Sequence, residues 1–142
     1  MKFLGLILGL GSLFAACGGK GETIKVSSSI APDKAAEMEF KETAHNFGTL
    51  MQGDTASHVF TFTNTSKNLL TIVNAQGSCG CTIPEYPKEP IAPGETGKIK
   101  VTFNSVGKRG YQKKDVTIEA NTIPSKTVLK IYANVSIEEN SE

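Results

Sequence analysis

Strict alternation of apolar and polar residues is the feature that most constrains how this chain can fold. In residues 97–104 every second side chain is apolar, at Ile99, Val101 and Phe103, and the positions between these three hold lysine or threonine. Successive side chains of a β-strand point to opposite faces of a sheet. The pattern therefore predicts a strand that buries one face and exposes the other.

Further strand patterns recur at short intervals along the chain. The predicted strands span residues 38–43, 57–64, 69–75, 97–104, 113–120 and 126–137. Phe60 and Phe62 mark the buried face of the second of these strands. Residues 69–75 are apolar on both faces, as is typical of a central strand. The other side chains expected in the core are Val116, Ile118, Leu129, Ile131, Ala133, Val135 and Ile137.

Polar segments rich in turn-forming residues separate the strands, at residues 45–48, 64–68, 107–110 and 121–124. Pro93 and Gly94 predict a further turn, because proline fixes its own φ and glycine accepts a positive φ. About seven short strands in about one hundred residues, without a long helix, are the pattern of an immunoglobulin-like (Ig-like) sandwich. The predicted fold is therefore all-β, a single Ig-like antiparallel β-sandwich over residues 38–137.

The first sixteen residues have the pattern of a signal peptide. Lys2 precedes an apolar run over residues 3–14, and Ala15-Ala16 supplies the small residues that signal peptidases require. The run is shorter than the about 20 apolar residues of a membrane-spanning helix. Cys17 directly follows Leu-Phe-Ala-Ala, which resembles a bacterial lipobox, so Cys17 is the predicted lipidation site. The alternative is an ordinary signal peptide and a free Cys17 thiol.

Residues 17–37 have the composition of a flexible linker, with a reach of about 25 Å. A helical turn is predicted at residues 35–38, at the end of this linker, and residues 138–142 are expected to form a disordered tail. Together with Cys17, these segments predict an exported protein that is lipid-anchored to the outer or inner membrane of a Gram-negative bacterium. The domain would then face the periplasm or the cell exterior.

Composition argues against several classes of function. Fifteen basic and fourteen acidic residues give a formal net charge of +1, which provides no electrostatic basis for binding nucleic acid. The chain has no tryptophan and only two histidines, His45 and His58. Neither a Ser-His-Asp set nor a pair of carboxylates with acid–base spacing is evident. We therefore expect a protein that is not an enzyme.

Cys79 and Cys81 are the strongest candidates for chemistry, because they would be the free thiols that remain after lipidation of Cys17. Cysteines two positions apart can form a disulfide, and Gly80 gives the backbone freedom to bend between them. The loop closed is so small that the chain-entropy formula gives it only roughly 1.6 kcal/mol of stabilisation. Such a bond is easily reduced, which suits a redox or regulatory pair.

Two other interpretations of the cysteine pair stay open. The loop can be a purely structural turn, which the lack of a neighbouring basic residue favours; Ser78 and Thr82 activate a thiolate only weakly. Alternatively, two thiolates suit Cu(I), so copper is possible, although no metal ligands are assigned. His45 and His58 could add ligands, but neither has ligand spacing to the cysteines. His58 shares the parity of Phe60 and is expected to be a strand-end or core residue.

Three sequence positions match glycosylation patterns. Asp54-Thr55-Ala56 resembles an O-glycosylation acceptor that one Gram-negative phylum uses, which makes Thr55 a possible acceptor. The alternative is an ordinary turn after Gly53. Asn64 and Asn134 match the N-glycosylation pattern, but a bacterial lipoprotein gives no reason to use it.

Several motifs together resemble one known family. They are Phe47-Gly48, Phe60-x-Phe62-x-Asn64, Cys79-Gly80-Cys81-Thr82, Pro90-Ile91-Ala92-Pro93-Gly94-Glu95 and Ile99-x-Val101-x-Phe103. The chain resembles a bacterial domain-of-unknown-function family that is common among exported lipoproteins of Gram-negative bacteria. The resemblance covers about residues 40–135. It implies an Ig-like fold similar to major sperm protein and pilus chaperone domains, and it implies no catalytic residues.

These observations favour a membrane-anchored, non-enzymatic Ig-like module that binds another protein of the cell envelope or serves envelope assembly. The loop formed by Cys79, Gly80, Cys81 and Thr82 is the expected contact or switch. The alternative is a thiol–disulfide redox or copper-handling protein that uses the same two cysteines.

Overall fold

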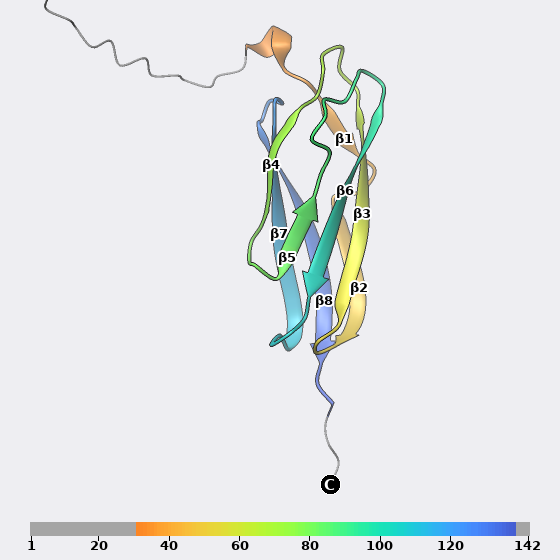
Figure 1. Ribbon diagram of the computed structural model, residues 1–142, viewed down its shortest axis with the longest axis vertical. Helices are drawn as coiled ribbons and strands as arrows, with labels where there is room; N and C mark the ends of the chain where they lie inside the picture. The colour runs from red at the N-terminus through yellow and green to blue at the C-terminus, as the bar shows by residue number, and fades with distance from the viewer. Residues whose placement is uncertain (1–30, 139–142) are drawn as a thin grey trace, which may run out of the picture.

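Two four-stranded β-sheets pack face to face in the computed structural model, which describes residues 31–138 (Figure 1). One sheet has the order β1 (Met38–Phe40), β3 (Thr55–Asn64), β6 (Thr96–Asn104), β5 (Thr82–Glu85). The other has the order β2 (Ala44–Met51), β8 (Lys126–Ser136), β7 (Gly110–Ala120), β4 (Ile72–Gly77). A short 3-10 turn, η1 (Pro32–Lys34), precedes them. The predicted all-β, Ig-like sandwich is confirmed.

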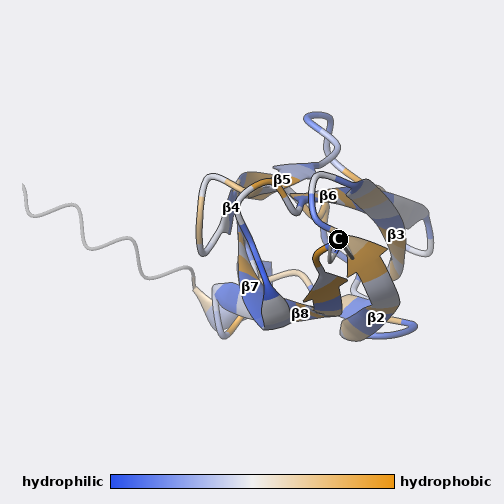
Figure 2. Cartoon of the chain, turned by 90° about the horizontal axis from the view of Figure 1, so that it is seen from below, coloured by the Kyte–Doolittle hydropathy of each residue, from blue (hydrophilic) through white to orange (hydrophobic). Residues whose placement is uncertain are grey.

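Viewed along its long axis, the molecule shows both edges of the sandwich (Figure 2). At one edge β4 lies beside β5, and at the other β2 lies beside β3. The chain crosses between the sheets at residues 41–43. On one side of this crossing the Lys41 amide donates to the Thr61 carbonyl of β3, at 3.0 Å. On the other side the Lys130 amide of β8 donates to the Thr43 carbonyl, at 2.8 Å.

The strand containing Ala44–Met51 differs from the prediction, which placed a turn at residues 45–48. Here Gly48 has a φ of 73°, and the pairing with β8 shifts register between Asn46 and Thr49. The Asn-Phe-Gly signal thus produces a bulge inside a strand and does not end it. This strand also runs parallel to β8, so the prediction of a wholly antiparallel sandwich is wrong at this pair. Residues 31–138 form eight strands, where about seven were predicted.

The predicted central strand at residues 69–75 is replaced by the edge strand β4, which begins at Ile72 and ends at Gly77. Leu70 and Ile72 are buried, whereas Leu69 and Val73 are 56% and 62% exposed. Leu70 lies before β4 and forms an isolated bridge to Ile91. The apolar side chains of this segment therefore lie on two different faces. One face packs in the core, and the other is exposed at the edge of the sheet.

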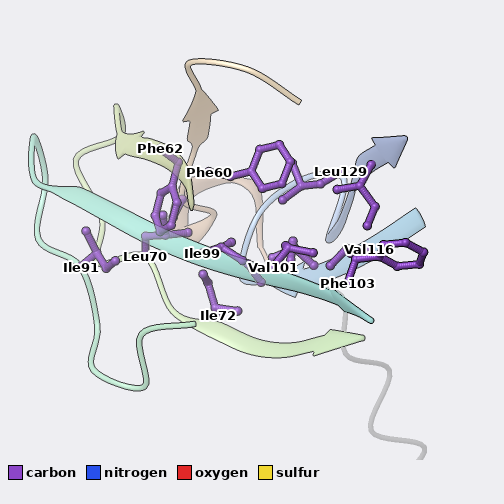
Figure 3. Close-up of a cluster of buried hydrophobic side chains, with 14 of the residues drawn as sticks. Phe60, Phe62, Leu70, Ile72, Ile91, Ile99, Val101, Phe103, Val116 and Leu129 are labelled. Carbon is purple, nitrogen blue, oxygen red and sulfur yellow. The ribbon is translucent and has the colours of Figure 1, made fainter. Parts of the chain in front are cut away.

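The core lies between the sheets and contains the side chains that alternation placed there, with one exception (Figure 3). Phe60, Phe62, Ile99 and Phe103 are fully buried. Ile137 was predicted to continue the buried face of the last strand, but β8 ends at Ser136 and Ile137 is 44% exposed. Beyond the end of the ladder, alternation no longer determines the direction of a side chain.

Residues 33–36, which were assigned to the linker, contact the domain. Ala36 is only 1% exposed, and its amide donates to the Asn121 carbonyl at 2.8 Å. The Asn68 side-chain amide donates to the carbonyls of Asp33 and Ala35. The helical turn expected at residues 35–38 is replaced by η1 at Pro32–Lys34.

Several predictions fall outside the described residues. These are the signal peptide, Cys17, the linker up to residue 30 and the tail from residue 139. Within residues 31–138, no helix is both long enough and apolar enough to cross a membrane.

Candidate functional site

The loop with the two cysteines connects β4 of one sheet to β5 of the other, at the edge where these strands meet (Figure 1). Cys79 and Cys81 are joined by a disulfide, with their Cα atoms 5.3 Å apart. Both residues are half-buried, Gly80 between them is exposed, and Cys81 packs against the core. Because both sulfurs are bonded to each other, neither is a thiolate ligand in this state.

Backbone hydrogen bonds attach this loop to both sheets. The Ser78 amide donates to the Asp115 carbonyl of β7 at 2.8 Å, and the Asp115 amide donates to the Ser78 hydroxyl. On the other side, the Asn104 amide of β6 donates to the Cys81 carbonyl at 2.9 Å. The loop is therefore held in one place by strands that flank it on both sides.

Gly77 is the glycine that this loop requires, although the sequence pointed to Gly80. A Cβ atom at Gly77 would lie 2.2 Å from the Thr82 carbonyl oxygen, so no larger residue fits without movement of the backbone. A Cβ atom at Gly80 would meet nothing within 4 Å, and Gly80 does not have a positive φ. The sequence did contain a signal for this close approach of the backbone at Thr82 to Gly77, because Gly77 is a glycine at the end of a strand, directly before the cysteine loop.

The surroundings of the disulfide do not activate a thiolate. The buried Thr82 hydroxyl lies 3.7 Å from the Cys79 sulfur and 3.8 Å from the Cys81 sulfur. A shallow groove of about 470 Å³ runs beside the loop, and within the described part of the chain no lysine, arginine or histidine lines it. Thiolates are stabilised by nearby positive charge or by helix N-termini, and the residues lining this groove provide neither.

Each of the two edge strands that the disulfide loop connects carries an exposed apolar side chain, and the one on β5, Ile83, also lines the groove beside the loop. Val73 of β4 is 62% exposed and Ile83 of β5 is 57% exposed. The Tyr86 hydroxyl donates to the Val73 carbonyl at 3.4 Å. β4 and β5 each pair with one neighbouring strand. Along its other edge, neither pairs with a strand of the described residues. This edge therefore combines open strand edges with apolar side chains.

The two histidines lie together at the opposite edge of the sandwich, away from the cysteines. His45 of β2 and His58 of β3 stack with ring centroids 3.5 Å apart, and His58 Nε2 is 2.6 Å from a carboxylate oxygen of Glu42. Burial lowers the pKa of His45, the neighbouring His58 lowers it further, and Glu42 opposes both effects. His58 was expected at a strand end or in the core. It lies on the same face of β3 as Phe60, but it is inside the strand and only half-buried. The sequence did not predict this cluster, because the two strands belong to different sheets.

The other candidate positions are distributed over the surface and the core. Thr55 is exposed at the start of β3, after a turn in which the Asp54 amide donates to the Met51 carbonyl. Asn64 is fully buried, which excludes it as a glycosylation acceptor, whereas Asn134 is exposed on β8. Gly94 has a φ of 79° and the Glu95 amide donates to the Ala92 carbonyl, so the predicted turn at Pro93 and Gly94 is present.

The fold and the loop together define an Ig-like sandwich domain in which a disulfide loop connects the two sheets at one edge. Residues 38–135 match the family described as "Protein of unknown function (DUF1573)", and the chain belongs to this family. No curated protein shows significant similarity to it.

Solved structures share the fold at low sequence identity. A protein of unknown function from Porphyromonas gingivalis W83 has a TM-score of 0.64 and 16% identity; the match covers 75% of this chain and only 50% of that protein. The PapD-like domain 7 of human CEP192 has a TM-score of 0.57 and 11% identity, over 94% of this chain and all of that domain. The E. coli chaperone DraB has a TM-score of 0.51 and 8% identity, over 71% of this chain and 56% of DraB.

Proposed function

We propose that this protein is an exported, lipid-anchored module that binds another protein of the cell envelope through the edge formed by β4, β5 and the disulfide loop. The observation that carries the proposal is the exposure of Val73 and Ile83 on two adjacent edge strands. Exposed edges of this kind accept an extended segment of a partner as an additional strand, while apolar side chains add contact area. The domain serves as a binding surface and has no catalytic role.

The fold supports a binding function by analogy. A chaperone, DraB, and a PapD-like domain of CEP192 share the sandwich, although at 8% and 11% identity the likeness extends to the fold alone. The disulfide loop supports the same proposal, because its attachment to β6 and β7 keeps the proposed contact surface pre-organised.

Site-specific photocrosslinking tests the binding surface. A photoreactive residue at Ile83 of the full-length protein, expressed in its native envelope, should crosslink to one discrete partner. The matched control is Val128, which is 42% exposed on β8 of the opposite sheet. The substitution Val73→Asp should abolish the crosslink from position 83 without changing the thermal midpoint, because Val73 is exposed. Equal crosslinking from both positions, or none from position 83, contradicts the proposal.

Lipid anchoring is tested separately at Cys17. The signal peptide pattern and the lipobox-like Leu-Phe-Ala-Ala-Cys segment support it. The intact mass of the membrane-extracted protein should equal that of the chain from Cys17 plus acyl groups. Cys17→Ser should move the protein into the soluble fraction. A membrane-extracted protein of unmodified mass rules out lipidation.

A thiol–disulfide function is the second candidate, because Cys79 and Cys81 enclose a single residue and are half-exposed beside a groove. Copper handling by this pair would require prior reduction of the bond, since a disulfide offers Cu(I) no thiolate ligand. Alkylation at a series of defined thiol–disulfide potentials distinguishes the two functions. Alkylation only under strong reduction favours the binding module, and cycling at mild potentials favours the redox function.

A further inference from the structure

We infer that Glu42, His45 and His58 form a binding site for a divalent transition-metal ion of the Zn²⁺, Cu²⁺ or Ni²⁺ class. This site lies at the β2–β3 edge, opposite the disulfide loop, and is independent of the function proposed above. One potential ligand atom of each residue lies within 4.8 Å of the others. Two donor atoms on one tetrahedral zinc ion are about 3.3 Å apart, so the side chains must draw closer together to bind one ion.

The types of ligand determine which ions fit. Two imidazole nitrogens and one carboxylate oxygen suit Zn²⁺, Cu²⁺ and Ni²⁺, whereas Ca²⁺ and Mg²⁺ prefer sets made of oxygen alone. Three protein ligands leave a fourth position for water or for a ligand from another molecule. Glu42 is exposed and both histidines are half-buried, so an ion can reach the site from solvent.

The backbone around each ligand is held by strands of both sheets. Glu42 lies in the crossing segment, between Lys41, which is bonded to β3, and Thr43, which is bonded to β8. His45 pairs with Ile131 in β8, and His58 pairs with Val101 in β6. The backbone of the three ligands is therefore positioned by two strand pairings and by the hydrogen bonds of the crossing segment before any ion arrives.

Apolar rings support the histidines from within the sandwich. The Phe47 ring contacts His45 edge to face with centroids 5.0 Å apart, and the Phe60 ring contacts His58 in the same way at 4.8 Å. Such apolar surroundings restrict solvent access around a metal site.

One movement of the histidine rings is required before an ion can bind. The lone pairs of an imidazole lie in its ring plane, and the two planes are within 8° of parallel, so at least one ring must turn to share an ion.

Binding at this edge would link the two sheets, since β2 and β3 belong to different ones. An ion that binds the folded but not the unfolded chain raises stability with its free concentration. We therefore expect Zn²⁺ to raise the thermal midpoint of the protein and to broaden or shift the ring proton signals of both histidines.

The test is a titration of the full chain with Zn²⁺, and in parallel with Cu²⁺. The protein is purified in detergent without a histidine tag, and no reductant is added, so that the disulfide stays closed. Calorimetry with a competing chelator should give one ion per chain. His45→Gln, His58→Gln and Glu42→Gln should each weaken binding by about tenfold or more. Glu39→Gln, which changes another exposed glutamate two strand positions before the crossing, should bind like the unchanged protein.

Two outcomes overturn the inference. One is the absence of stoichiometric binding at millimolar Zn²⁺ and Cu²⁺. The other is binding that none of the three substitutions weakens, which would place the ion elsewhere. The histidine ring signals keep the test decisive if a variant is less stable, because they report directly on the ligands in the unchanged protein.

Discussion

At the scale of single residues, Asn64 shows how one polar side chain organises an end of the sandwich. Its amide nitrogen donates to the carbonyls of Asn68 and Ile91, both at 2.8 Å. Its side-chain oxygen accepts from the backbone amide and the hydroxyl of Ser66. The turn after β3 and the proline-rich segment before β6 are thus joined through one buried group.

Replacement of Asn64 by alanine should therefore lower the free energy of unfolding by about 2–4 kcal/mol, because several buried hydrogen bonds are lost together. Urea denaturation monitored by circular dichroism measures this change. Asn134→Ala, at an exposed position of β8, is the matched control and should stay within about 0.5 kcal/mol. A loss below 1 kcal/mol at Asn64 would show that the network contributes little.

Gly77 and Gly80 provide a second comparison at this scale. Gly77→Ala should destabilise the protein by about 1–3 kcal/mol, because the new methyl group overlaps the Thr82 carbonyl. Gly80→Ala should be nearly neutral, since its methyl group points into open space. Thermal unfolding of the two variants side by side is sufficient. Equal effects would mean that the loop relaxes to accommodate a side chain at Gly77.

At the level of single residues, prediction from the sequence succeeded where the alternating pattern of a strand coincides with large apolar side chains. Phe60, Ile99 and Phe103 were placed in the core by alternation alone, and the structure confirms them. Asn64 was assigned to a polar turn, because nothing local shows that the distant Ile91 carbonyl accepts a hydrogen bond from its side chain. The requirement at Gly77 was equally hidden, since the opposing Thr82 oxygen is brought there by the fold.

At the scale of the elements, prediction was weakest for the strands at the sheet edges. β5 was read as part of a loop, because the proline and the cysteine pair obscure a short strand that pairs with β6 on one side only. β4 was placed in the centre of a sheet, because exposed apolar residues at an edge have the same sequence pattern as residues buried on both faces. Edge strands carry these proposed contacts, so the least predictable elements are also those of greatest functional interest.

The β4–β5 connection allows a prediction about the disulfide. Cys79→Ala combined with Cys81→Ala should remain folded and lose no more than about 1.6 kcal/mol, because the bond closes a very short loop and the hydrogen bonds to Asp115 and Asn104 remain. Urea denaturation of the double variant beside the oxidised protein measures the loss. Unfolding of the variant would show that the bond is required for the fold itself.

At the scale of the whole molecule, the Ig-like sandwich was predictable because its four long core strands, β3, β6, β7 and β8, repeat one simple rule, the alternation of buried and exposed side chains. The parallel pairing of β2 with β8 was not. Ala44 pairs with Lys130 across most of the chain, and no local pattern encodes a partner at that distance. The cluster of Glu42, His45 and His58 was missed for the same reason, since only the packing of the sheets brings its members together.

The position of β8 predicts a strong dependence of folding on the end of the chain. Deletion of residues 126–142 should leave the remainder unfolded, because β2 and β7 both lose their shared partner and the core loses Leu129, Ile131 and Val135. Circular dichroism and proteolysis measure this loss. A synthetic peptide of residues 126–142 should restore folding when it is added to the truncated chain. A folded truncated chain would contradict the prediction.

The pairing of β2 with β8 also bears on the order in which the protein is made. β1, β3, β5 and β6 are all present once residue 104 has been synthesised, so one sheet is complete while the chain is still growing. β2 has no strand partner until Lys126–Ser136 emerges at the very end. A chain that leaves the ribosome from its N-terminus therefore stays open along one side throughout synthesis. The second sheet and the core between the sheets can therefore be completed only after β8 has been made, because β8 is the shared partner of β2 and β7.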